Sequence, residues 1–416
     1  MSRGNYQLLR TILDHEEPER VPSFHLGYAS RVLERALLEY KEPDETDVCL
    51  YYDEGPEPRQ GIIDLTIDHV LGYTGHYRGA GFDHRKSMGA YYAPGMADRP
   101  FAARFTNPRD ARDVDTNLRS GKLWHVGSFG QCHAQRAKAG PDDEGFSSYY
   151  VDGVLAPDTF DEWLAGNEYA PSHPNVHAFL GRLCKDIQAR LHDWSMPVIG
   201  AGGVADSTIM ALKGNWGAFA LWKRKNPAFL DRVVKWMFGI LRDCLYLPLL
   251  EAGVPIIYWG EDLGQKDRLL IAAADYERFF APCLAELARL VHEHGARLVM
   301  HSDGNVSEAV PVLVKCGIDG LQALEPASGM DLGELARKHG DKIAFFGALD
   351  QRVLCWGSVD ETIQMVKNTI KKGVKAGAKF ALGPSHQPIG AKAENMFAMM
   401  AAIKKYGTYP IHFESF

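Results

Sequence analysis

Residues 297–305 read RLVMHSDGN, an apolar run that stops abruptly at a histidine, an aspartate and a glycine. Four similar runs lie in the same half of the chain: VPIIYWG (254–260), IDGLQALEP (318–326), KIAFFGALD (342–350) and KFALGPS (379–385). Runs of this length that are apolar throughout are typical of strands buried on both faces, as in parallel sheets. The sequence therefore predicts buried parallel strands from residue 254 to residue 385.

Helical patterns separate these runs. Apolar residues recur at helical spacing from Tyr276 to Val291, and this segment closes at Gly295. Ser358 and Glu361 have the spacing of a capping box at the start of another helix. A strand followed by a helix, repeated five times, requires parallel strands joined by right-handed crossovers.

The N-terminal half supplies more elements of the same kind. Its strand candidates are VPSFHLG (21–27), LTIDHVLGY (65–73), SYYVDGVL (148–155) and PVIGAGG (197–203), and residues 227–253 read as one long helix. Eight or nine strands alternating with helices favour an α/β fold of the (β/α)8 TIM-barrel type over an open sheet. We expect one domain over residues 1–416, with an N-terminal helical extension and a long irregular insertion at 73–145 that covers the barrel mouth.

Composition excludes several classes of function. The chain has 416 residues, is 46% hydrophobic and 24% charged, and carries a formal charge of −7, as expected for a globular protein. Without a block of basic residues, we expect neither a nucleic-acid partner nor a membrane-surface partner. The start of the chain lacks the apolar core of a signal peptide, and the seven scattered cysteines form no CxxC motif, so we expect a cytoplasmic protein.

Polar residues stand at the ends of the predicted strands. In a (β/α)8 barrel the C-terminal ends of the strands converge on one rim, which is where functional groups lie. The acids and histidines at these positions are His25, Glu261, Asp262, His301, Asp303, Glu325, Asp350 and His386. The run at 297–305 thus ends in polar groups because the barrel brings them to a common rim.

Each of these residues also has a purely structural interpretation. Asp350 fits a helix cap, Glu325 a brace for its loop, and His25 a hydrogen-bonded core residue. His301, Asp303 and His386 are harder to explain in that way, because two imidazoles and a carboxylate suit a divalent metal, zinc in particular. The glycine-rich GAGGVAD (200–206) fits a tight turn better than a phosphate loop, since it matches neither common phosphate-binding pattern.

Several segments resemble one known family. They are LLRTILDHEEPERVPSF (8–24), HSDGN (301–305), GIDG (317–320), GALD (347–350) followed by the Ser358 helix start, and GPSHQPIGAKAENMFAMMAAIKKYG (383–407). In order and spacing they are similar to the uroporphyrinogen decarboxylase superfamily, and within it to the branch of cobalamin-dependent methyltransferases. That branch binds zinc through a His-x-Cys pair and a later Gly-Pro-x-Cys cysteine, and these positions correspond to His301, Asp303 and His386 in this chain.

The resemblance implies a function. Replacing both thiolates by a carboxylate and an imidazole gives a harder metal site, which suits polarisation of an oxygen. The resemblance therefore implies a methyltransferase. Such an enzyme activates a methoxy or methylamine-type substrate and passes the methyl group to the cobalamin of a separate corrinoid protein. The Asp-x-His-x-x-Gly signature for binding the corrinoid itself is missing from this sequence. Relatives of this kind often pair, so a homodimer is possible.

The candidate catalytic residues are Glu261, Glu325 and His25. The two glutamates are expected to complete the metal coordination or to donate a proton to the leaving group. Two alternatives stay open. One is a decarboxylase of the same superfamily, although the arginine-rich segment that binds tetrapyrrole carboxylates has no counterpart in VPSFHLGYASRVLER (21–35). The other is a non-catalytic binding barrel that has lost its metal.

Overall fold

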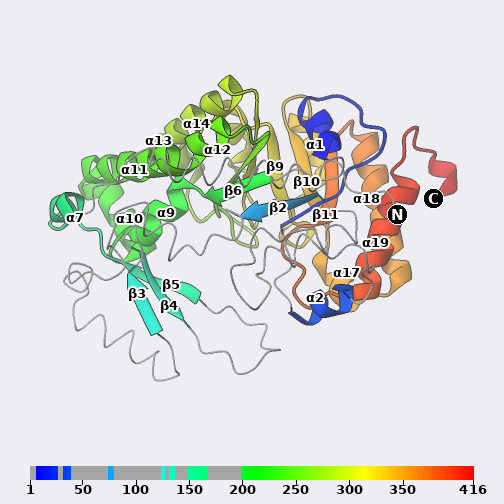
Figure 1. The fold of residues 1–416 in the computed structure, drawn as a ribbon, viewed down its shortest axis with the longest axis horizontal. Helices are drawn as coiled ribbons and strands as arrows, with labels where there is room; N and C mark the ends of the chain where they lie inside the picture. Colours follow the sequence, from blue (N-terminus) through cyan, green and yellow to red (C-terminus); the bar gives the residue numbers. More distant parts are fainter. Residues whose placement is uncertain are drawn as a thin grey trace.

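The computed structural model describes residues 6–26, 31–38, 74–78, 123–126, 131–135, 148–166 and 198–416. Eight parallel strands form one sheet in the order β1-β2-β6-β7-β8-β9-β10-β11, with helices around it (Figure 1). The strands are β1 (Phe24–His25), β2 (Thr74–Arg78), β6 (Val198–Gly202), β7 (Ile256–Gly260), β8 (Arg297–His301), β9 (Gly320–Leu324), β10 (Ala344–Leu349) and β11 (Phe380–Pro384). The five strands predicted after residue 254 are confirmed, as are β1 and β6.

The sheet closes on itself. The amide of Leu382 in β11 donates to the carbonyl of Pro22 at 2.9 Å, and Ser23 pairs with Leu382 in parallel. At the same seam, a Cβ on Gly383 would lie 1.8 Å from the carbonyl oxygen of Phe24, so the two backbones are in direct contact. The chain therefore forms the predicted (β/α)8 TIM barrel.

Two predictions change in the region before residue 160: where the insertion begins, and to which sheet the strand at 148–155 belongs. The insertion cannot begin at residue 73, because Thr74–Arg78 is barrel strand β2, paired with β1 and β6. The candidate strand at 65–73 lies outside the described residues. Ser148–Gly153 is indeed a strand (β5), but it belongs to a separate three-stranded antiparallel sheet with β3 (Leu123–Val126) and β4 (Gln131–Gln135). That sheet packs on helix α9, and whether the insertion covers the barrel mouth stays a prediction.

Helices cover the outside of the barrel. The helices with described bounds are α1 (Tyr6–Leu13), α2 (Arg31–Leu38), α7 (Phe160–Gly166), α9 (Val204–Ala211), α10 (Asn215–Lys225), α11 (Pro227–Leu241), α12 (Leu247–Glu251), α13 (Ala273–Phe279), α14 (Ala281–Glu293), α15 (Val310–Cys316), α16 (Leu332–His339), α17 (Gln351–Trp356), α18 (Val359–Lys375) and α19 (Ala393–Tyr406). A π-helical turn joins α11 to α12, so the long helix predicted at 227–253 is nearly continuous. The Ser358–Glu361 capping box is present at the start of α18. Within the described residues, the helices are too short or too polar to cross a membrane.

Alternation along the strands divides the core into two layers. One buried cluster fills the barrel interior and includes Tyr258 and Val299, while their neighbours Trp259 and Met300 belong to the cluster under the helices. Successive strand residues point to opposite faces, so this parity fixes which side chains after each strand face the barrel axis. This alternation therefore decides which polar side chains at the strand ends can meet inside the barrel.

Helix α1 closes the N-terminal end of the barrel. Leu9, Ile12 and Leu13 belong to the interior cluster. The guanidinium of Arg10 donates to the carbonyl of Gly295 just before β8, at 2.8 Å. With this end filled by packed side chains, the opposite rim is left for a functional site. The predicted N-terminal helical extension therefore has a structural role.

Lys404 on α19 is an unfavourably placed cation. Within the described structure its Nζ is buried without a hydrogen-bond partner. Burial, and next the charge of Arg20, lower the pKa of Lys404 from 10.5 to about 8. Because the unfolded chain keeps this proton to a higher pH than the folded chain does, the ammonium destabilises the fold below pH 8. That penalty is relieved as the pH rises from about 8 to 10.5.

We expect Lys404→Met to stabilise the protein at neutral pH. Methionine is nearly as long as lysine but carries no group that needs a hydrogen-bond partner, and the gain is about 1 kcal/mol after allowing for solvent screening of a partly buried side chain. Urea unfolding followed at several pH values checks this result. The advantage of the variant should shrink as the pH rises from 8 to 10.5; a gain that is the same at all pH values would contradict the assignment to the ammonium charge.

Candidate metal centre

The ends of β8 and β11 bring the three predicted ligands together. His301 is the last residue of β8, Asp303 follows two residues later, and His386 lies two residues after β11. One ligand atom from each can be chosen so that all lie within 4.8 Å of one another. The Nε2 of His386 is 3.0 Å from Oδ2 of Asp303, and the Nε2 of His301 is 3.7 Å from Oδ1 of the same carboxylate. This donor set fits a divalent cation.

Asp262 is a fourth group at this cluster. Its Oδ1 lies 3.4 Å from Nε2 of His301 and accepts a hydrogen bond from the amide of Asp303 at 3.2 Å. Tyr258 faces the barrel interior, and Asp262 is four residues further along the chain, so alternation directs it to the same side. The sequence contained this signal, because the spacing from Tyr258 distinguishes Asp262 from its neighbour Glu261.

Two loops packed against each other support the cluster. The amide of Leu263 donates to Ser302 Oγ at 2.8 Å, and the amide of Asn305 donates to the carbonyl of Gln265 at 2.7 Å. Gly304 has φ +78°, and a Cβ there would lie 2.5 Å from the Gln265 carbonyl oxygen. The glycine of the HSDGN stretch is therefore required by a close backbone approach as well as by its left-handed conformation.

Burial and neighbouring charges shift the pKa values of three groups at this cluster, His301, Asp262 and Asp206. Burial alone would lower the pKa of His301, but the hydrogen bond with Asp262 and the charge of Asp303 outweigh it, and the pKa is raised. Burial would raise the pKa of Asp262, but His301 lowers it overall. Behind them, Asp206 in the first turn of α9 accepts from the Asp262 amide at 2.8 Å. Burial, followed by the charge of Asp262, raises the pKa of Asp206 well above its usual range. The site thus places a carboxyl group of raised pKa behind the carboxylates of Asp262 and Asp303, which face the two imidazoles.

Glu261 lies elsewhere, contrary to the prediction that it joins this cluster. Its side chain is fully buried on the outer face of the sheet, where Oε1 accepts from the Ala205 amide at 2.5 Å and Oε2 accepts from the Tyr276 hydroxyl at 2.7 Å. Burial raises the pKa of Glu261 to about 7, against the effect of these hydrogen bonds. A Cβ on Gly203 would lie 2.5 Å from this carboxylate, so the glycines of GAGGVAD make a tight turn around an internal carboxylate. Glu261 holds the start of α9 in place, and Asp262 takes the position expected for it.

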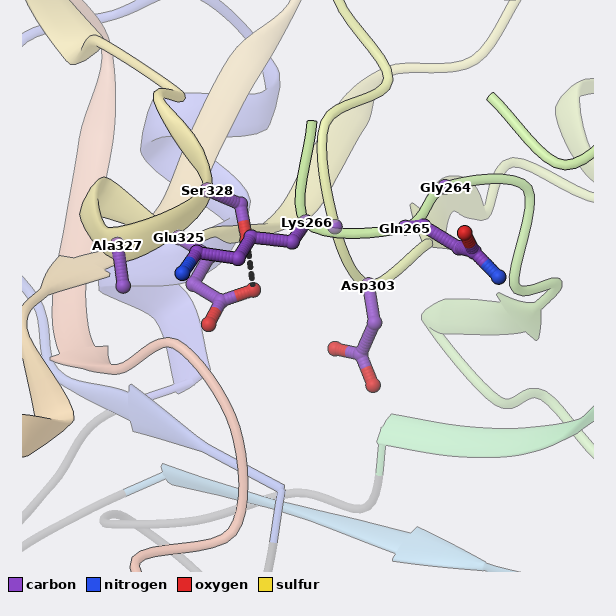
Figure 2. Close-up of a pocket in the computed structure, with 8 residues that line it drawn as sticks. Gly264, Gln265, Lys266, Asp303, Glu325, Ala327 and Ser328 are labelled. Carbon is purple, nitrogen blue, oxygen red and sulfur yellow. Dashed lines mark hydrogen bonds between the residues drawn. The ribbon is translucent and has the colours of Figure 1, made fainter. Parts of the chain in front are cut away.

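Glu325 lies at a cavity beside the cluster. The cavity has a volume of about 320 Å³ and is lined by Gly264, Gln265, Lys266, Asp303, Gly304, Glu325, Ala327 and Ser328. The carboxylates of Asp303 and Glu325 point into the space between them, and Ser328 Oγ donates to Glu325 Oε2 at 2.7 Å (Figure 2). Because Asp303 belongs to both the ligand group and the cavity, a molecule in the cavity would touch the candidate metal centre.

The remaining strand-end candidates have different positions. His25 is fully buried in β1 and belongs to neither the ligand group nor the cavity lining. Its neighbour Phe24 occupies the barrel interior against Tyr258 and Phe346, so alternation directs His25 to the outer face. Asp350 caps α17 by accepting from the Arg352 amide, as the structural interpretation proposed. Gln322 and Tyr258 were not predicted as site residues, and both contact His301 from inside the barrel, Gln322 through a hydrogen bond and Tyr258 through ring stacking.

The chain is similar to known proteins in its sequence family and in its fold. A family model described as "Uroporphyrinogen decarboxylase (URO-D)" matches residues 175–406, which is more than half of the chain. A solved structure described as "methyltransferase from Methanosarcina mazei" matches with a TM-score of 0.58 and 16% identity, over 97% of this chain and 99% of that chain. A D-psicose 3-epimerase from Clostridium cellulolyticum H10 matches with a TM-score of 0.32 and 11% identity, over 54% of this chain and 82% of that chain. No curated protein sequence matches the chain.

Proposed function

The chain belongs to the uroporphyrinogen decarboxylase (URO-D) family, and on that basis we propose that it is a metal-dependent methyltransferase. It takes a methyl group from a methoxy compound or a methylamine and passes it to the cobalamin of a separate corrinoid protein. The observation that carries the proposal is the convergence of His301, Asp303 and His386. The fold similarity to a methyltransferase over nearly the whole of both chains is consistent with it.

The donor set fits a catalytic zinc site. Two imidazoles and one carboxylate are ligand types of such sites, and with three protein ligands one position stays open for substrate. A bound divalent cation would supply Lewis acidity and so lower the basicity of the leaving oxygen or nitrogen. Asp262 stands 3.4 Å from Nε2 of His301 and could serve as a further ligand or as an acceptor for the substrate.

The cavity supports a small substrate. Its volume of about 320 Å³ is at the small end of the range for ligand pockets, about 300–1,000 Å³. Two of its lining side chains are carboxylates and one is a lysine, so it has little to offer several carboxylates of a tetrapyrrole. This favours the methyl-transfer proposal over decarboxylation of a tetrapyrrole.

In the proposed reaction the methyl group leaves as a methyl-cation equivalent. When bound, the corrinoid in its Co(I) state would supply the electron pair of the new Co–C bond. The electron pair of the broken C–O or C–N bond stays on the oxygen or nitrogen, which takes up a proton. Glu325, across the cavity from Asp303 and held by Ser328, is our candidate for passing a proton to that atom.

Two measurements test the proposal. Metal analysis of protein purified without a metal-binding tag should give one divalent ion per chain. Methylation of free reduced cobalamin should then be found with one member of a panel of methoxyaromatics and methylamines, followed through the absorption spectrum of the corrinoid. A folded, metal-free protein that binds no added zinc would favour the non-catalytic barrel. Metal binding without methyl transfer from any donor would sink the donor class proposed here.

A further inference from the structure

We propose that Gln322 is the positioning residue of the metal centre, and that its single side-chain amide orients both histidines. This inference rests on the metal centre of the proposed function. Gln322 is fully buried in β9 and is paired in register with His301 of β8. A fully buried amide inside a barrel is costly unless all its hydrogen bonds are satisfied. The Gln322 amide has partners at both ends: Tyr258 and His301 at its oxygen, and Ser385 at its nitrogen.

The hydrogen bonds of Gln322 fix the orientation of its amide. Its Nε2 donates to the carbonyl oxygen of Ser385 at 3.1 Å, and a carbonyl oxygen can only accept, so this end must be the nitrogen. The Oε1 end therefore accepts, and it does so from the hydroxyl of Tyr258 at 2.5 Å and from Nδ1 of His301 at 2.5 Å. One amide thus links side chains of β7, β8 and β9 to the backbone that follows β11.

The first consequence concerns the tautomer of His301. Because Oε1 of Gln322 can only accept, Nδ1 of His301 must carry a hydrogen. In the neutral imidazole the lone pair is then on Nε2, which is the atom that faces Asp262 and Asp303. The ring of Tyr258 stacks on the imidazole, with centroids 5.7 Å apart and planes at 27°. His301 is therefore fixed in the tautomer and orientation that a metal ligand needs.

The second consequence concerns His386. The carbonyl held by Gln322 belongs to Ser385, the preceding residue, which is itself buried. This bond ties the chain after β11 to β9 immediately before the second histidine, whose Nε2 lies 3.0 Å from Oδ2 of Asp303. His386 is about one-third exposed, so its position depends more on its backbone than on packing. Gln322 thus sets the spacing between the two imidazoles.

A distortion of the strand accompanies this arrangement. Gln322 pairs with Phe346 of β10, but the next pair joins Leu324 to Gly347, so Ala323 is an extra residue on β9. Ala323 has φ +72°, in the left-handed region that residues with a Cβ seldom adopt. A bulge of this kind redirects the side chains on either side of it. Here those side chains belong to Gln322 and, further on, to Glu325 at the cavity.

Gln322→Leu tests the proposal. Leucine fills a similar volume but can neither accept from His301 nor donate to Ser385. We expect zinc affinity, measured by competition with a chelator, to fall by about ten- to a hundredfold, as when the outer partner of a ligating histidine is lost. Gln322→Glu keeps an oxygen acceptor for Nδ1 of His301 and should lose less affinity than Gln322→Leu.

Asn395→Leu is the matched control. Asn395 is another fully buried amide, and it donates to the carbonyls of Leu354 and Gly357, away from the ligand cluster. Both leucine variants should lower stability, but only Gln322→Leu should weaken zinc binding. Equal zinc affinities in the wild type and in Gln322→Leu, or equal losses in the two leucine variants, would overturn the positioning role.

A second measurement needs no metal. Nitrogen NMR of the metal-free protein at alkaline pH, where the imidazole is neutral, should show His301 as the Nδ1–H tautomer in the wild type and a mixture in Gln322→Leu. The opposite tautomer in the wild type, or no change in the variant, would count against Gln322 even if zinc binds. A wild type that shows the expected tautomer but binds no zinc would sink the proposed function and leave the orientation of His301 by Gln322 intact.

Discussion

His301→Ala is expected to abolish tight metal binding, and methyl transfer with it. His301 is one of three candidate ligands, and its Nε2 faces the carboxylates of Asp262 and Asp303, which would both lose this imidazole as a partner. The binding free energy of a zinc site with four ligands is about 10–16 kcal/mol, or about 3–4 kcal/mol for each ligand. Removing one ligand should therefore weaken the zinc affinity by about a hundred- to a thousandfold. Zinc content after dialysis against a weak chelator, measured by elemental analysis, reads out the loss.

His386→Ala should behave in the same way, because the second imidazole contacts the same Asp303 carboxylate. His292→Ala is the matched control: His292 contacts Asp319 through its Nε2 at 2.8 Å and is outside the ligand group. The control should keep the zinc content and activity of the wild type. If both ligand variants keep stoichiometric zinc while remaining folded, the ion is bound elsewhere and the metal centre described here is wrong.

Gly383→Ala is expected to cause the largest loss of stability among the substitutions considered. A Cβ at this position would lie 1.8 Å from the carbonyl oxygen of Phe24, and backbone cannot move aside as a flexible side chain can. β1 would have to separate from β11 at the seam where the barrel closes, where Leu382 bonds to Pro22. We expect a loss of about 3 kcal/mol or more in the free energy of unfolding, above the usual cost of overpacking.

The measurement for Gly383→Ala is urea unfolding followed by circular dichroism, with Gly217→Ala as the control. Gly217 is exposed in α10, and a Cβ there meets nothing within 4 Å. Alanine in a helix is favoured over glycine by about 1 kcal/mol, so the control should be slightly more stable than the wild type. A Gly383→Ala variant as stable as the wild type would mean that β1 and β11 do not close the barrel in solution.

The candidate site was partly predictable because position along the chain and position in the fold are linked in a parallel barrel. His301, Asp303 and His386 each follow an apolar strand, and the carboxyl ends of parallel strands meet at one rim. Their convergence could be inferred without coordinates. The choice of Glu261 over Asp262 was wrong because adjacent residues point to opposite faces of a strand. Counting residues from Tyr258, which faces the barrel interior, would have identified Asp262 as the inward residue.

By itself the sequence determined the number and direction of the C-terminal strands, the helix caps and the three ligand candidates. These features depend on local periodicity and on neighbours close along the chain. Only the tertiary structure shows that residues 74–78 form a barrel strand and that Glu261 bonds to the start of α9. It also shows that Gln322 links His301 to the backbone just before His386. The reason is physical: these depend on contacts between segments far apart in the chain and on a bulge at Ala323, and no local pattern encodes either.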